Sequence, residues 1–203
     1  MRHTIDTSSL RYTLCFCQQD DWLLLLFRAK APHAGMWNGV GGKIEPGETP
    51  LQCVQREVLE ETGVALPEEA FRLRGIVTWP PDDAVNGQGS GMYVYVAQAP
   101  HDLARWETPR TVPDGLLAWH PSAWACSPDT TAVVENIPHF LKPMLAGAPI
   151  AHYACDYQGD RLVAVVKYPL PGSVSQATHQ HDAGHHENHA GETLWRDRNL
   201  GQS

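Results

Sequence analysis

The sequence predicts an α/β domain in which helices cover a β-sheet. Three observations predict it. Short apolar, β-capable runs recur from the N-terminus to about residue 170, a strongly patterned helix follows a glycine-rich turn near residue 50, and a second helical stretch comes late in the chain. Layers of this kind bury the apolar face of each element, so we expect an α/β sandwich.

Length and composition indicate one soluble domain with a tail. The chain has 203 residues, of which 42% are hydrophobic and 19% are charged, enough for a substantial core. A net charge of −8 argues against a nonspecific nucleic-acid-binding surface, but not against a nucleotide whose phosphates a divalent metal neutralises. We therefore expect a small nucleotide rather than a nucleic-acid polymer as the partner.

Cysteine usage and the N-terminus indicate a cytoplasmic protein. The five cysteines show no CxxC pair and no disulfide framework, which favours reduced thiols. The N-terminus lacks an apolar signal core, and the longest apolar run is too short to cross a bilayer. We expect no membrane partner, and the sequence carries no marker of oligomeric state.

The first elements read as a hairpin and a loop. Arg11–Cys17 and Trp22–Arg28 are β-capable runs on either side of a polar turn. The run Leu23–Leu26 is continuous rather than alternating, which is typical of a strand buried on both faces. Ala29–Met36 contains Pro and Gly and predicts a loop that leads to Trp37.

The next element is a helix with clear end signals. Thr49 can cap its N-terminus, Pro50 fits the first helical position, and Gln52 stands where a capping box has its partner. Gly63 is a C-terminal stop. Residues at the spacing of a buried stripe are Leu51, Val54 and Val58.

The second half predicts more strands and one more helix. The expected strands are Phe71–Trp79, Met92–Ala99, Leu116–Trp119 and a last hairpin of Ile150–Tyr157 with Leu162–Tyr168. Between these strands we expect a single turn at Pro67–Ala70 and a polar loop at Arg105–Asp114. We also expect a helical turn that starts at Pro121 and a helix at Thr130–Leu145, which Pro138 interrupts or restarts. Residues 171–203 are polar and His-rich and predict a disordered tail, although such a tract can also bind transition metals.

Three carboxylates gather on the helix that starts near residue 50. Glu57, Glu60 and Glu61 stand at the three- and four-residue spacings that bring side chains together. Like charges repel at these spacings, so the cluster suggests a bound cation. Converging carboxylate oxygens suit Mg²⁺, with Mn²⁺ as an alternative. We expect this site to face solvent rather than the core.

The same region carries a family motif. It consists of Gly42, five residues, Glu48, seven residues, Arg56-Glu57-Val58, one residue, Glu60-Glu61, one residue and Gly63-Val64. In this pattern the chain resembles the Nudix (MutT-like) hydrolases, which cleave a nucleoside diphosphate linked to a further group. The resemblance implies a Nudix-type α/β/α sandwich with a mixed sheet and the carboxylate helix on one face, which we place at residues 1–170.

The resemblance also implies roles for single residues. Glu57, Glu60 and Glu61, with the backbone carbonyl of Gly41, would hold the metal, and one carboxylate would act as general base on the attacking water. Some members of the family use an acid from a later loop instead, for which the candidates here are Asp102, Glu107 and Asp114.

Charged neighbours of the carboxylates complete the predicted catalytic set. Arg56 would orient Glu48 and the other carboxylates through bidentate hydrogen bonds, one layer behind the metal ligands. Lys43 would offset charge on the departing phosphate, as its position in MutT-like enzymes suggests. The alternative for Lys43 is a solvated surface lysine.

Substrate choice rests on a second resemblance. The segment Trp37-Asn38-Gly39-x-Gly41-Gly42-Lys43 is similar to that of the oxidised-purine nucleoside triphosphatases, such as 8-oxo-dGTP diphosphatase. It implies that Asn38, Gly42 and Lys43 bind substrate. Asn38 would read the base, because an amide offers a donor and an acceptor together. The alternative is that Asn38 caps a turn.

The rest of the predicted base pocket departs from these relatives. They contact the base through acids and aromatics before the last helix, where this chain has Glu135 and Asn136 but no Trp-Pro-Asp-Asp. Trp119 and Trp124 are candidates for stacking on a base, or for the core.

Two alternatives to an oxidised-purine substrate stay open at this stage. Pro80 lies 16 residues beyond Val64, about where ADP-ribose pyrophosphatases of the superfamily carry a proline, so ADP-ribose or another nucleoside diphosphate derivative is the second choice. A non-catalytic Nudix-fold nucleotide-binding module is the third. Such modules typically lose carboxylates of the motif, and this chain keeps all three.

Overall fold

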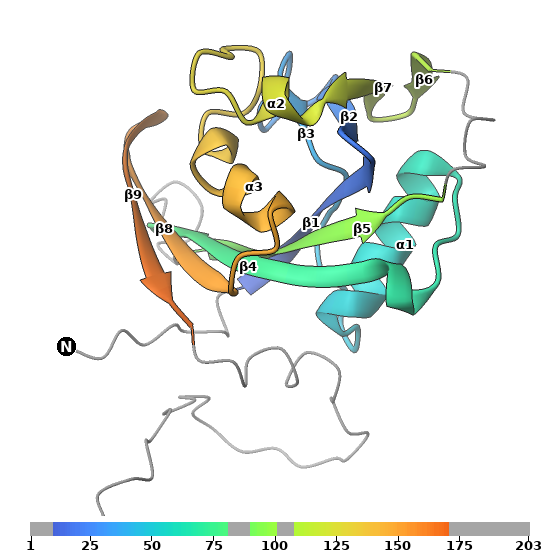
Figure 1. Cartoon of the computed structure of the whole chain (residues 1–203), viewed down its shortest axis with the longest axis horizontal. Helices are drawn as coiled ribbons and strands as arrows, with labels where there is room; N and C mark the ends of the chain where they lie inside the picture. The colour runs from blue at the N-terminus through green and yellow to red at the C-terminus, as the bar shows by residue number, and fades with distance from the viewer. Residues whose placement is uncertain (1–9, 81–89, 101–107, 171–203) are drawn as a thin grey trace, which may run out of the picture.

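The computed structural model describes residues 10–80, 90–100 and 108–170 (Figure 1). The strands are β1 (Leu10–Gln19), β2 (Trp22–Arg28), β3 (Trp37–Asn38), β4 (Phe71–Trp79), β5 (Ser90–Gln98), β6 (Arg110–Val112), β7 (Gly115–Pro121), β8 (Ala151–Gln158) and β9 (Arg161–Pro169). The helices are α1 (Pro50–Thr62), α2 (Ser122–Ala125) and α3 (Ile137–Leu145), with one 3₁₀ turn, η2, at Glu68–Ala70. The predicted tail, residues 171–203, lies outside the described residues, as do Asp102 and Glu107.

The strands form one mixed sheet. Its order is β6-β7-β2-β1-β5-β4-β8-β9, and β3 pairs with β2 off this path. β1 runs parallel to β5 and β4 runs parallel to β8, whereas the other pairs are antiparallel. Parallel neighbours need a long connection, and the chain between the members of these two pairs contains α1 and α3, respectively.

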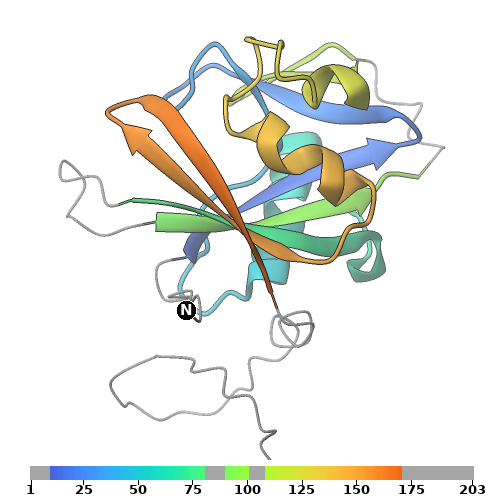
Figure 2. The same ribbon diagram turned by 60° about the vertical axis from the view of Figure 1, so that its left-hand side comes forward.

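The two longer helices cover opposite faces of the sheet (Figures 1 and 2). Alternate residues of the same strand therefore pack under different helices. On β2, Leu24 and Leu26 belong to the core under α1, and Leu23 and Leu25 to the core under α3. All four are buried, so the predicted strand with two buried faces is confirmed, as is the predicted α/β/α sandwich.

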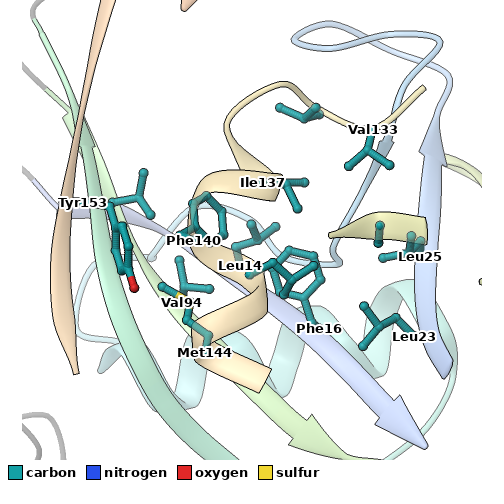
Figure 3. Packing of buried hydrophobic residues seen from close by; sticks show 14 of the residues in the cluster. Leu14, Phe16, Leu23, Leu25, Val94, Val133, Ile137, Phe140, Met144 and Tyr153 are labelled. Atoms are coloured by element: carbon teal, nitrogen blue, oxygen red, sulfur yellow. The ribbon is translucent and has the colours of Figure 1, made fainter. Parts of the chain in front are cut away.

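Figure 3 shows the core under α3. Ile137, Phe140 and Met144 of α3 are buried and stand one helical turn apart on one side of the helix. They pack against residues of the central strands, namely Leu14, Phe16, Leu23, Leu25 and Val94. This packing fixes α3 on the face opposite α1.

The predicted ends of α1 are confirmed. The Thr49 side chain accepts a hydrogen bond from the Gln52 N–H, and the Gln52 side chain accepts one from the Thr49 N–H. Gly63 ends the helix in the left-handed conformation, with φ at 74°, which glycine adopts without strain.

The predicted helix at 130–145 is wrong over its first half. α3 begins only at Ile137, and Pro138 lies in its first turn, where a missing N–H costs nothing. The preceding residues pair with Trp37 instead: its N–H donates to the Ala132 carbonyl, and its own carbonyl accepts from the Val134 N–H. Long-range pairing thus replaces local helix formation.

The loop predicted at 105–114 contains a strand. β6 is three residues long and pairs antiparallel with β7. A strand this short has no alternation to detect, and the neighbouring strand supplies its hydrogen bonds. No helix in the described ranges is long and apolar enough to span a membrane.

Candidate active site

The glycine turn is an extended segment that pairs with β1. The N–H groups of Thr13 and Cys15 donate to the carbonyls of Gly42 and Val40, at 2.8 and 2.7 Å. The N–H and C=O of successive residues point to alternate sides of an extended chain, so the N–H and C=O of Gly41 point away from β1. The Gly41 N–H donates to Glu61 Oε2 at 3.0 Å. Gly41 thus faces α1.

Neither Gly41 nor Gly42 has room for a side chain. A Cβ at Gly41 would lie 2.2 Å from the Thr13 carbonyl oxygen, and its φ of +152° also favours glycine. A Cβ at Gly42 would lie 2.2 Å from Glu57 Oε1. The absence of a side chain at Gly41 lets the segment lie against β1, and its absence at Gly42 leaves room for the Glu57 carboxylate.

Glu61 is buried under this segment. Its exposed fraction is 9%, so the expectation that the carboxylates all face solvent is wrong for this residue. Burial raises the pKa of Glu61 to about 8, the hydrogen bond from Gly41 opposes the shift, and the charge of Glu57 adds to it. Glu61 is therefore a carboxyl group that ionises readily only beside a compensating positive charge.

Arg56 holds the other carboxylates. Its Nε and Nη2 form a fork on Glu48, at 2.7 and 3.0 Å. Its Nη1 donates to Glu57 at 2.8 Å and to Glu60 at 3.1 Å. The bond to Arg56 lowers the pKa of Glu48, whereas burial raises the pKa of Glu57. The Arg56–Glu48 contact predicted from the sequence is present.

The donor set fits a hard divalent cation. Glu57, Glu60 and Glu61 offer only oxygen donors, which Mg²⁺ and Mn²⁺ prefer. Within the described ranges, no three His, Cys, Asp or Glu side chains already stand close enough together to hold an ion, and Arg56 engages Glu57 and Glu60. A cation beside buried Glu61 would supply the charge that this group needs to ionise.

Asn38 lies on the same face as the carboxylates. It pairs with Leu26, whose side chain belongs to the core under α1, and directly opposed residues of antiparallel strands point to the same face. Its Oδ1 accepts from the Gly39 N–H at 2.8 Å, so the turn-capping contact is present and holds the amide in place.

The side chain of Lys43 is exposed, and the backbone carbonyl of Lys43 accepts a hydrogen bond from Arg56 Nη2.

Several residues predicted for the base pocket have structural partners. Glu135 accepts from the Leu162 N–H at 2.9 Å, and Asn136 Nδ2 lies 3.2 Å from the Tyr157 hydroxyl, so both tie the start of α3 to the β8–β9 hairpin.

The two candidate tryptophans lie on different faces of the sheet. Trp124 packs against the core under α3 and stacks on His120, at 4.5 Å between ring centroids. Trp119 packs against the core under α1 and so shares the face of Asn38 and the carboxylates.

The turn between β6 and β7 also approaches the site. Asp114 forms an ion pair with Lys30 at 3.1 Å, and its charge contributes to the raised pKa of Glu61. On β6, Arg110 donates from Nη2 to the carbonyl of Thr62, the last residue of α1. No local sequence pattern indicates a role for Arg110, because 48 residues separate it from Thr62 and only the fold brings the two together.

Comparison with known proteins identifies the family. A family model of the NUDIX domain matches residues 10–137. The chain therefore belongs to the Nudix family, and it is a Nudix hydrolase, an enzyme of the pyrophosphohydrolase class. The complete set of motif carboxylates agrees with this catalytic class, whereas a non-catalytic binding module would typically lack some of them.

Three similar proteins place the chain within the family. It is 29% identical over 154 residues to the uncharacterised Nudix hydrolase YvcI of Bacillus subtilis, a match that covers 72% of this chain and 86% of YvcI. It is 40% identical over 60 residues to the oxidised purine nucleoside triphosphate hydrolase of Mus musculus, which covers 30% of this chain and 38% of that protein. The crystal structure of the MutT protein of Bacillus halodurans superposes with a TM-score of 0.63 at 25% identity and covers 79% of this chain and 99% of that one.

Replacing Gly42 tests the close approach of backbone and carboxylate. In Gly42→Ala the new Cβ collides with the far end of the flexible Glu57 side chain, so we expect the carboxylate to move while the fold survives. Misplacement by about 1 Å costs on the order of 10²-fold in rate, and we expect metal-dependent kcat/KM to fall by that order. The thermal unfolding midpoint should change little.

A double variant shows whether Gly42 acts through Glu57. If it does, Gly42→Ala/Glu57→Gln is no less active than Glu57→Gln alone, because the second change removes nothing further. Losses that simply multiply would mean that Gly42 contributes in another way.

Buried Glu61 predicts how stability depends on pH in metal-free protein. Its pKa is about 8 in the folded chain and about 4.3 in the unfolded chain. Between these values the folded state keeps a proton that the unfolded state has lost, so the free energy of unfolding falls as pH rises and levels off above about 8. Urea unfolding in excess chelator at several pH values measures this slope. Glu61→Gln should make the free energy of unfolding depend less on pH. An unchanged slope in this variant would contradict the assignment of the slope to Glu61.

Proposed function

We propose that the protein hydrolyses a nucleoside triphosphate to the monophosphate and pyrophosphate with Mg²⁺, or alternatively Mn²⁺, as cofactor. The favoured substrate is an oxidised purine nucleotide such as 8-oxo-dGTP. One observation carries the proposal: Asn38 and the carboxylates of α1 share one face of the sheet, joined by the segment from Gly39 to Gly42. The identity to the mouse oxidised-purine hydrolase supports the substrate class.

The chemistry follows from the charge of the substrate. Oxygens of a pyrophosphate linkage repel an incoming nucleophile, and a bound divalent ion neutralises them and lowers the pKa of a bound water. Glu57, Glu60 and Glu61, with the Gly41 carbonyl, would hold that ion. Arg56, anchored on Glu48, would set the directions of Glu57 and Glu60.

Two further groups act on the proton and on the leaving phosphate. A carboxylate takes the proton of the attacking water. Glu57 and Glu60 are the candidates on the helix, and Asp114 is the late-loop acid that approaches Glu61 in the described residues. Exposed Lys43, next to Gly42, offsets charge on the departing phosphate.

The spacing of the two ends of the site suits a nucleotide. Asn38 stands three residues before Gly41, about 10 Å along an extended chain. A base at Asn38 and phosphates at Gly41 would therefore lie along one continuous stretch of backbone. The Oδ1 of Asn38 is engaged by the Gly39 N–H, so its Nδ2 is the group that would donate to an acceptor on the base. ADP-ribose, suggested by the position of Pro80, is the second candidate.

A comparison of substrates tests both hypotheses, an oxidised purine nucleotide and ADP-ribose. We expect the wild-type enzyme with Mg²⁺ to show a higher kcat/KM for 8-oxo-dGTP than for dGTP or ADP-ribose. In Asn38→Ala we expect the preference for 8-oxo-dGTP over dGTP to shrink by on the order of tenfold, the value of one or two hydrogen bonds. Equal losses on both nucleotides would make Asn38 structural. A preference for ADP-ribose would keep the metal chemistry and reassign the substrate.

A further inference from the structure

Arg110 connects the edge of the sheet to the carboxylate helix. It is half-buried on β6, and its Nη2 donates to the Thr62 carbonyl at the end of α1. Thr62 follows Glu61 directly, and Glu61 is bound to the Gly41 N–H. One contact from Arg110 therefore acts on the turn of α1 that carries the buried carboxylate.

The register of the sheet explains why Arg110 reaches this point. Arg110 pairs with Leu117, Leu117 pairs with Leu26, and Leu26 pairs with Asn38. Leu117 and Leu26 both face α1, and directly opposed residues share a face. Arg110 thus stands in the same cross-strand row as Asn38, on the face that α1 covers.

The end of α1 lacks a positive charge of its own. The C-terminal end of a helix carries a partial negative charge from its unpaired carbonyls, and here the carboxylate of Glu60 adds to it. The last turn of α1 contains no basic residue. Arg110 supplies from strand β6 the cation and the donor that a Lys, Arg or His in the last turn of a helix can provide.

We propose that Arg110 is a positioning residue for the metal site. By holding the last turn of α1 against the sheet, it keeps Glu61 on Gly41 and so keeps the predicted ligands together. The inference rests on the proposed function, because it takes Glu61 as a metal ligand. Arg110 itself touches neither substrate nor metal in this account.

Binding of Mn²⁺ alone, measured by electron paramagnetic resonance, tests the positioning role of Arg110 without any substrate. Loss of a group that orients metal ligands costs on the order of 10- to 100-fold in metal affinity. We expect Arg110→Ala to weaken Mn²⁺ binding by about tenfold and Arg110→Lys, which keeps the charge, to restore part of it. Added guanidinium ion should also rescue Arg110→Ala in part.

A matched control separates positioning from general stability. Arg72, an exposed residue of β4, likewise donates to backbone carbonyls, namely those of Glu69 and Phe71. Because these carbonyls do not belong to α1, Arg72→Ala should leave the Mn²⁺ affinity unchanged. Wild-type Mn²⁺ affinity in Arg110→Ala, with or without a lower unfolding midpoint, would overturn the positioning role and leave the proposed function standing. Failure of the wild-type protein to bind Mn²⁺ would overturn both.

Discussion

The close approach of the Gly41–Gly42 backbone to α1 is the constraint on which the site depends. β1 holds this segment from one side through the carbonyls of Val40 and Gly42, and α1 meets it from the other through Glu61 and Glu57. A side chain at Gly41 would push the segment away from β1, and one at Gly42 would displace the Glu57 carboxylate. The segment therefore meets both neighbours with its backbone, and Glu61 and Glu57 of α1 lie directly against it.

This arrangement concentrates negative charge that the fold has to balance. Arg56 balances it from within the helix by binding three carboxylates, and the bond to Glu48 fixes its own position. Arg110 balances the end of the helix from another strand. Burial nevertheless leaves Glu61 with a pKa of about 8. We expect a site built this way to favour a cation, because the ion would relieve both the repulsion between the carboxylates and the desolvation of the buried carboxyl group.

Local signals allowed the site helix to be predicted closely. The capping pair Thr49 and Gln52, the stop at Gly63 and the spacing of the glutamates all act within a few residues, so they can be read directly from the sequence. Strand β2 was also predictable, because a continuous apolar run needs two buried faces. The contact of Arg56 with Glu48 followed from the family motif.

The remaining features depend on contacts between distant parts of the chain. Residues 132–134 could have continued a helix, but they pair with Trp37, and β6 exists only beside β7. Glu61 continues the buried stripe of Leu51, Val54 and Val58, whereas exposed Glu60 stands off it. The partner of Glu61, however, is the Gly41 N–H, which lies 20 residues earlier and which the helical pattern does not reveal. The same holds for Arg110, which the register of β6, β7 and β2 places on the face of α1 and whose partner Thr62 lies 48 residues earlier.

We propose that the carboxylates of α1 and the Gly41 carbonyl hold one divalent ion. Diffraction from crystals soaked in Mn²⁺, with data collected near the manganese absorption edge, tests it most directly. We expect an anomalous peak about 2–2.6 Å from oxygens of at least two of Glu57, Glu60 and Glu61 and from the Gly41 carbonyl, with Arg56 displaced from Glu57. A bound Mn²⁺ elsewhere in the molecule, with no peak at these oxygens, would contradict it.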